Sequence, residues 1–229
     1  MRAFTVVLLS MILFVATGCE KTPAPPARPG GGGGGNTPAP PDNGGEITPP
    51  APTENGDTKK AGGPSVPDKL PDAKPDAHLV GDKAWDTYST GQKVWRQELA
   101  ALMVKGKPKL KDVVQLDMKR HFARIDLAAA RFRYLMENDA ARLVRKEGIG
   151  AFVNFEWTSK DTDRMRQEDP DAVIHEARER RLTKEVEAHA TWEESRKHFR
   201  NEVSLSPEFQ EIDDRFKAKT DEAESMLGG

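Results

Sequence analysis

Few residues in this chain of 229 have the types and spacing that catalysis or metal binding requires. The only cysteine, Cys19, excludes a disulfide framework within the chain and a CxxC redox pair. The run from His175 to Glu179 begins like a zinc-protease motif, but Glu179 stands where the second histidine ligand is needed. No Gly-x-Ser-x-Gly nucleophile turn occurs. We therefore expect no catalytic residue, no metal site and no cofactor, and we interpret the protein as not being an enzyme.

Four histidines follow an acidic residue by four positions, a spacing that makes the two side chains neighbours on a helix. We interpret these pairs as charge patterning on helix surfaces. The alternative is a weak metal-binding or pH-responsive surface, because histidine titrates at about pH 6.5. The pairs are Asp117/His121, Asp171/His175, Glu185/His189 and Glu194/His198.

The charge balance limits the partners. The chain has 35 basic and 37 acidic side chains and a net charge of −2. A nucleic-acid binder needs clustered lysines and arginines that outweigh the acids. The composition therefore predicts no nucleic-acid partner.

The N-terminal residues have the order of a secretory signal. Arg2 supplies a positive start, residues 6–15 are an uncharged apolar run, and small residues lead to Cys19. The apolar run has about half of the ~20 residues that a membrane-spanning helix needs. We predict a signal peptide over residues 1–18.

This N-terminus resembles that of the bacterial lipoproteins, whose signal ends in Gly or Ala followed by a cysteine that is lipidated. The resemblance covers residues 1–19 and implies cleavage by signal peptidase II between Gly18 and Cys19, with a diacylglyceryl group on the Cys19 thiol. Ala16 departs from the family, which usually has an aliphatic residue there. The implied location is the bacterial cell envelope, on a periplasmic or surface-facing membrane side. The alternative is an ordinary signal peptide with an incidental cysteine.

Residues 19–77 are predicted to form a lipidated N-terminus and a disordered tether. Residues 20–77 include 14 Pro and 11 Gly and no Phe, Trp, Tyr or Met. A segment with so few apolar groups cannot offset the entropy lost on ordering. As a random coil it would span ~40–45 Å.

Residues 78–229 are predicted to form an all-α domain. Residues 109–147 contain neither Gly nor Pro, and from Val114 to Leu143 a stripe of mostly apolar positions recurs at steps of three or four residues, with one step of five. A helix over residues 108–147 would be ~60 Å long, which exceeds the ~40 Å of a compact globule of this size. We therefore expect an elongated antiparallel helical bundle or a coiled-coil hairpin.

Capping residues predict the remaining helices. Asp82, Asp169 and Ser206 precede helical stretches that run to about residue 106, through residues 171–206 and through residues 207–227. A break at residues 89–92 is an alternative for the first, because Ser89 and Gln92 have capping-box spacing.

The connection at residues 148–169 is aromatic and does not follow the helical pattern. Two interpretations stay open: its aromatic side chains form a plug at the end of the bundle, or they form an exposed binding patch. The interaction-surface candidates are Phe152, Phe155, Trp157 and, on the weaker apolar stripe of residues 171–206, Trp192.

Together these features favour a membrane-anchored envelope lipoprotein whose helical domain has a structural or protein-interaction role. Its partners would be the membrane, through lipid on Cys19, and another envelope protein or a second copy of the chain. One alternative is a chaperone-like or ligand-binding lipoprotein. The other is an enzyme that modifies an envelope polymer, for which paired carboxylates in a cleft would be required.

Overall fold

The computed structural model describes residues 74–228, which form helices and connections without a β-strand. The all-α class is confirmed for this part of the chain. The signal segment, the cleavage point between Gly18 and Cys19, the lipidation site and residues 20–73 of the tether lie outside the described residues. None of the helices in residues 74–228 combines the length and apolar composition that crossing a membrane requires.

The first long helix, α2 (Lys83–Gly106), begins at the predicted cap. The side chain of Asp82 accepts a hydrogen bond from Trp85 N at 3.0 Å, which satisfies an N–H that the helix itself leaves free. The alternative break at residues 89–92 does not occur, and Ser89 is buried inside the helix.

The second long helix, α3 (Lys111–Asn138), is shorter than predicted. It follows a 3₁₀ turn, η1 (Pro108–Leu110), and ends nine residues before residue 147. The next residues form two further 3₁₀ turns, η2 (Ala140–Arg142) and η3 (Arg145–Glu147). In these turns Arg142 pairs with Asp161, and Arg145 pairs with Asp82, the cap of α2. Both ion pairs are made by residues that lie beyond the end of the helix. The 28 residues of α3 are ~42 Å long, instead of the ~60 Å predicted for a helix over residues 108–147.

The aromatic connection contains two helices, α4 (Ile149–Val153) and α5 (Ser159–Glu168). The helix α5 starts at a complete capping box, in which the side chains of Thr158 and Asp161 each accept from the other's backbone N–H. Gly148 precedes α4 with φ of 89°, a conformation that favours glycine.

The predicted stretch over residues 171–206 is divided. It contains α6 (Pro170–Ala188), α7 (Trp192–Asn201) and the 3₁₀ turn η4 (Val203–Leu205). His189 leaves the helical conformation with ψ of 128°, and its Nδ1 contacts Thr191 Oγ1 at 3.2 Å. The last helix, α8 (Pro207–Ser225), begins at the predicted cap Ser206.

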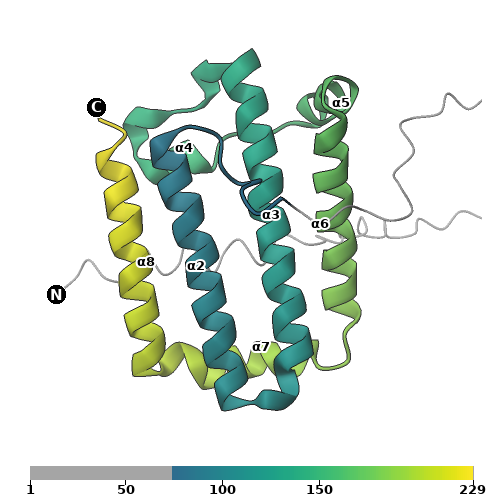
Figure 1. The fold of residues 1–229 in the computed structure, drawn as a ribbon, viewed down its shortest axis with the longest axis vertical. Coiled ribbons are helices and arrows are strands. Elements are labelled where there is room, and N and C mark those ends of the chain that lie inside the picture. The colour runs from purple at the N-terminus through teal and green to yellow at the C-terminus, as the bar shows by residue number, and fades with distance from the viewer. Residues whose placement is uncertain (1–73, 229) are drawn as a thin grey trace, which may run out of the picture. The chain divides into compact units, whose positions relative to one another are not determined.

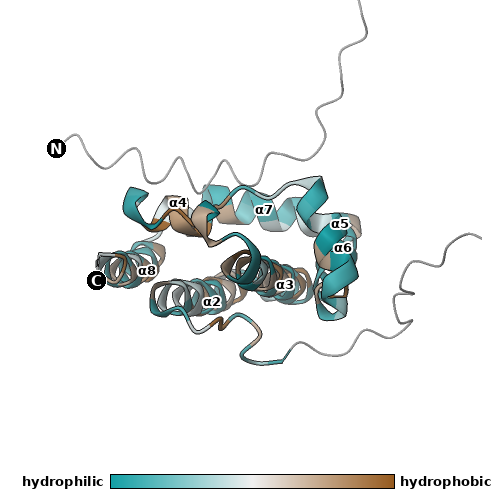
Figure 2. Cartoon of the chain, turned by 90° about the horizontal axis from the view of Figure 1, so that it is seen from above, coloured by the Kyte–Doolittle hydropathy of each residue, from teal (hydrophilic) through white to brown (hydrophobic). Residues whose placement is uncertain are grey.

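Four helices lie side by side in the order α8, α2, α3 and α6 (Figure 1), and each adjacent pair is in contact. Figure 2 shows α4 and α7 on one side of α8, α2 and α3, and the segment that precedes α2 on the other side.

Two apolar clusters fill the space between the helices. The first joins α2, α3, α4 and α8 and includes Trp85, Phe132 and Phe152. The second lies around the turn from α2 to α3 and includes Leu99 and Leu110. Along α3, the residues between the two clusters include the buried charged groups Arg120 and Asp126. The middle of α3 is therefore packed through charged as well as apolar contacts.

Candidate interaction residues and a buried charged layer

Phe152, one of the four candidate interaction residues, is completely buried. Its ring centroid lies 5.1 Å from that of Phe132, and the guanidinium of Arg145 lies 4.6 Å from its centre. Such burial is what a plug requires, because a fully enclosed ring offers no area to a partner. Phe152 therefore belongs to the core.

Phe155 and Trp157 are half-buried and continue the same aromatic group. The Phe155 ring lies 6.0 Å from Phe132 and 6.4 Å from Trp157. Trp157 Nε1 donates a hydrogen bond to Thr162 Oγ1 at 3.0 Å, and the guanidinium of Arg131 lies 5.2 Å from the ring. Both side chains therefore pack on the fold and keep part of their surface in solvent.

Trp192 lies apart from these three residues, at the start of α7. Its ring contacts the second apolar cluster, and two guanidiniums lie near the ring, that of Arg120 at 5.1 Å and that of Arg196 at 5.9 Å. Arginines over an indole gain about 0.5–2 kcal/mol from the charge of the ring face. Trp192 is half-buried, and its ring is engaged by the chain's own arginines.

Three arginines gather where α2 faces the middle of α3. Arg120 is 7% exposed and pairs with Asp117, and its Nε has no hydrogen-bond partner among the described residues. Arg124 pairs with Glu179 of α6 at 2.7 Å. The guanidiniums of Arg120 and Arg124 lie close enough to repel the positive charge of Arg96 on α2. Arg120 and Arg124 each have a carboxylate partner, as a buried arginine usually does, whereas the ion pairs found within residues 74–228 include none for Arg96.

Burial and the neighbouring arginines shift the pKa values of Arg96 and His121. Burial lowers the pKa of Arg96 to about 10, Arg120 and Arg124 act in the same direction, and Asp117 opposes them. Burial also lowers the pKa of His121 well below 6.5, and the three arginines add to this effect. His121 is therefore neutral at pH 7, and its 3.7 Å contact with Asp117 is not an ion pair.

Of the four predicted acid–histidine pairs, only Asp117 and His121 lie within 4 Å of each other in the part of the chain that the structure describes. His198 instead lies 3.2 Å from Glu202, and Glu194 pairs with Lys109. His198 is 3% exposed, and its Nε2 lies 3.3 Å from the carbonyl oxygen of Met103. It is therefore a core residue and not part of a surface pattern.

The residues of the zinc-like motif are engaged by arginines. Glu176 accepts hydrogen bonds from Arg166 at 2.8 and 3.0 Å and from Arg180 at 3.0 Å, and Glu179 binds Arg124. Within residues 74–228, no three acidic, histidine or cysteine side chains are grouped to hold a metal ion. The carboxylates of this motif act in helix-to-helix ion pairs.

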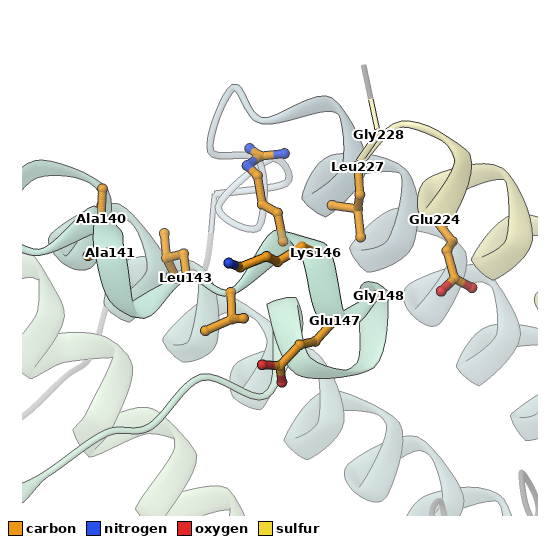
Figure 3. A pocket seen from close by; sticks show the side chains of 11 residues that line it. Ala140, Ala141, Leu143, Lys146, Glu147, Gly148, Glu224, Leu227 and Gly228 are labelled. Atoms are coloured by element: carbon orange, nitrogen blue, oxygen red, sulfur yellow. The ribbon is translucent and has the colours of Figure 1, made fainter.

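A shallow depression of about 830 Å³ lies between the turns η2 and η3 and the end of α8 (Figure 3). Leu143, Val144 and Leu227 give it apolar surface. Glu147 and Glu224 line it from η3 and α8, and Arg145 and Lys146 of η3 add positive charge. It therefore combines apolar surface with charges of both signs.

A groove of about 730 Å³ runs between α2 and α8. Its lining includes Val94, which is 46% exposed. Gly91 lets the helices approach closely, since a Cβ there would lie 3.1 Å from Lys219 Cβ. Glu98 and Arg215 form an ion pair of 3.0 Å at the groove. Its other apolar lining residues are Trp95, Ile212, Phe216 and Ala218.

The buried charges and the groove were missed by sequence reasoning. Arg120 and Asp126 lie between the members of the predicted apolar stripe, where a helix with one buried face would expose them. Lys93 and Asp126 are 33 positions apart, so no helical spacing relates them. For Val94 a signal existed, because it is an apolar residue that does not share the helical spacing of Trp95, Leu99 and Leu102 on the same helix.

Comparisons of the chain with protein-family models, with curated proteins and with solved structures found no match.

Proposed function

We propose that the chain is a bacterial envelope lipoprotein, anchored through lipid on Cys19, whose helical domain binds another envelope protein or a second copy of itself without catalysis. The observation that carries the proposal is the position of the only cysteine, directly after a short apolar segment and three small residues. Two or more acyl chains are needed for stable anchoring, at about 0.8 kcal/mol per buried CH₂.

In this proposal residues 20–73 form a disordered tether, and the helices of the domain form an elongated antiparallel bundle. Residues 74–77, the end of the predicted tether, are instead ordered in a turn, and Arg133 of α3 binds the carbonyl oxygen of Ala77. The high Pro and Gly content supports the tether. The contacts of α2 with α3 and α8, and of α3 with α6, support a bundle. The tether would give the domain ~40–45 Å of reach from the membrane.

The groove between α2 and α8 supports an interaction role for the domain. Apolar side chains from both helices line it, although α8 is otherwise charged and exposed along most of its length. A grouped apolar lining on a charged surface is typical of a binding site.

Lipid anchoring is tested by cell fractionation of the wild type and the Cys19→Ala variant, together with incorporation of labelled palmitate. We expect the wild type to be labelled and to sediment with membranes, and the variant to be unlabelled and released from them. A variant that is exported and remains membrane-bound would contradict the proposal.

The interaction role is tested by crosslinking in intact cells. We expect Val94→Arg to lose crosslinked species that the wild type forms, because a charge would occupy the groove. The matched control is Gln97→Arg, an exposed position of the same helix that does not line the groove. Equal crosslinking by both variants would show that the groove is not the contact.

A further inference from the structure

Residues 74–82 form a strap that crosses from α3 to the start of α2. Arg133 of α3 donates hydrogen bonds to two strap carbonyl oxygens, at 3.2 and 3.1 Å. Trp85 Nε1 of α2 donates to a third at 2.9 Å. The carboxylate of Asp86 accepts from two strap N–H groups, at 2.7 and 3.0 Å. The root of the expected tether is thus held by side chains of both helices.

The side chain at the centre of the strap is His78, which is 7% exposed. Its Nε2 lies 3.1 Å from Thr90 Oγ1 of α2, within hydrogen-bond distance. Its Nδ1 is buried and has no hydrogen-bond partner among the described residues. Protonation would place an N–H on both nitrogens, and the second would be a buried donor without an acceptor.

The charged groups around His78 come from three elements. On α2 these are Lys93, whose charge repels a protonated imidazole, and Asp86, which is occupied by the strap N–H groups. On α3 they are Asp126, which is paired with Lys93 at 2.8 Å, and Arg133, which binds the strap carbonyls. The strap itself contributes Asp76.

The attractive charges do not outweigh the burial. Burial and Lys93 lower the pKa of His78 below 6.5, although the three aspartates oppose them. The docked strap therefore favours a neutral imidazole, and a released strap lets His78 take up a proton.

We propose that the strap is an acid-sensitive latch. The neutral His78 side chain lies against Thr90 and keeps the strap, the root of the tether, docked on α2 and α3, and protonation of His78 releases the strap from both helices. Release would free nine residues, which extend to at most ~30 Å, and would uncover Thr90, Lys93 and the Trp85 indole N–H. This property goes beyond the proposed anchoring and holds whether or not Cys19 carries lipid.

Hydrogen exchange of the purified full chain tests the latch. Rates are measured on peptides covering residues 74–90 at pH 7.5 and at pH 5, corrected for intrinsic exchange, with residues 99–114 of the second apolar cluster as the internal reference. The docking constant, which is the equilibrium ratio of docked to released strap, should fall about tenfold for each pH unit between pH 6.5 and the pKa of the docked imidazole. We expect strap protection to fall by up to about 30-fold relative to the reference.

The variant His78→Gln has a side chain that stays neutral and can still donate to Thr90, so we expect it to keep strap protection at pH 5 within about twofold. The matched control, His189→Gln at the turn between α6 and α7, should retain the pH dependence of the wild type. Wild-type strap protection that is unchanged between the two pH values would overturn the proposal, as would equal losses in the wild type and His78→Gln.

If His78→Gln does not dock its strap at pH 7.5, the imidazole resonance of wild-type His78 decides. A titration midpoint that coincides with the loss of strap protection supports the latch. A His78 that titrates while the strap stays protected overturns it.

Discussion

The carboxylate of Asp126 is 1% exposed and accepts a hydrogen bond from Lys93 Nζ at 2.8 Å, an ion pair that joins the interior faces of α2 and α3. Lys93 Nζ also lies 5.4 Å from the centre of the Phe122 ring. The free-energy cost of removing two charges from water offsets most of the free energy gained from their attraction. Such a pair adds little net stability, but either charge without its partner is strongly unfavourable.

We therefore expect Asp126→Ala to lower the free energy of unfolding by about 3–5 kcal/mol. The variant leaves the Lys93 ammonium in a nearly closed site with no opposite charge. Urea unfolding followed by circular dichroism measures the loss. The double variant Lys93→Met/Asp126→Leu is the control, and it should recover most of the stability because no charge is left buried. A double variant as unstable as Asp126→Ala would show that the cost is one of packing.

The position of Phe152 predicts a second effect on stability. Its ring is fully enclosed by Phe132 and its neighbours, so Phe152→Ala should cost about 3–5 kcal/mol through lost burial and the cavity that remains. Leu205→Ala is the control, because Leu205 is 77% exposed, and its effect should stay within about 0.5 kcal/mol. Similar melting temperatures for the two variants would rule out a core role for Phe152.

Helix starts were predictable from the sequence, and helix ends were less so. Asp82, Asp169 and Ser206 cap helices as predicted, because a cap needs only a side chain and an N–H two or three residues away. The end of α3 depends on the pairs Arg142/Asp161 and Arg145/Asp82, whose members lie 19 and 63 positions apart. Such distant partners leave no periodic trace in the sequence.

The apolar stripe of α3 was predicted correctly at four positions, since Val114, Ile125, Phe132 and Leu135 are buried. A single stripe, however, describes a helix with one covered face. Because α3 contacts α2, α6 and α7, further faces are closed, and charged residues on them become buried. The candidate residues were found by their aromatic character, whereas the arginine layer becomes evident only when the neighbours of α3 are known.

Gly148 provides a test of backbone conformation. Its φ of 89° is unfavourable for any other residue, and a Cβ there would lie 2.6 Å from Glu224 Oε1. We expect Gly148→Ala to lower stability by about 1–2 kcal/mol. Gly150→Ala is the matched control, because Gly150 lies in α4 with open space at its Cβ, and it should be neutral or stabilising by up to about 1 kcal/mol. Thermal unfolding of both variants measures the difference, and equal melting temperatures would contradict the argument.

Mild acid should destabilise the helical domain through His121. Its pKa is well below 6.5 in the folded chain because burial and three arginines disfavour the charged form. The unfolded chain, with a histidine pKa of about 6.5, binds the proton more tightly. The stabilisation is therefore complete above pH 6.5 and is lost as pH falls below it, at about 1.4 kcal/mol per pH unit.

Urea unfolding at pH 7 and at pH 5 should accordingly show a lower stability at pH 5, with a loss of up to about 2 kcal/mol from His121, and the lowered pKa values of His78 and His175 act in the same direction. The carboxylates whose pKa is lowered, Asp161 and Glu176 among them, keep their contribution over this range, because they lose it only below about pH 4.5. The variant His121→Gln cannot gain the proton, so its stability should change less between the two pH values. A wild type that is equally stable at pH 5 and pH 7 would show that His121 is protonated inside the fold without penalty, and the arginine layer would then have to open in acid to admit water.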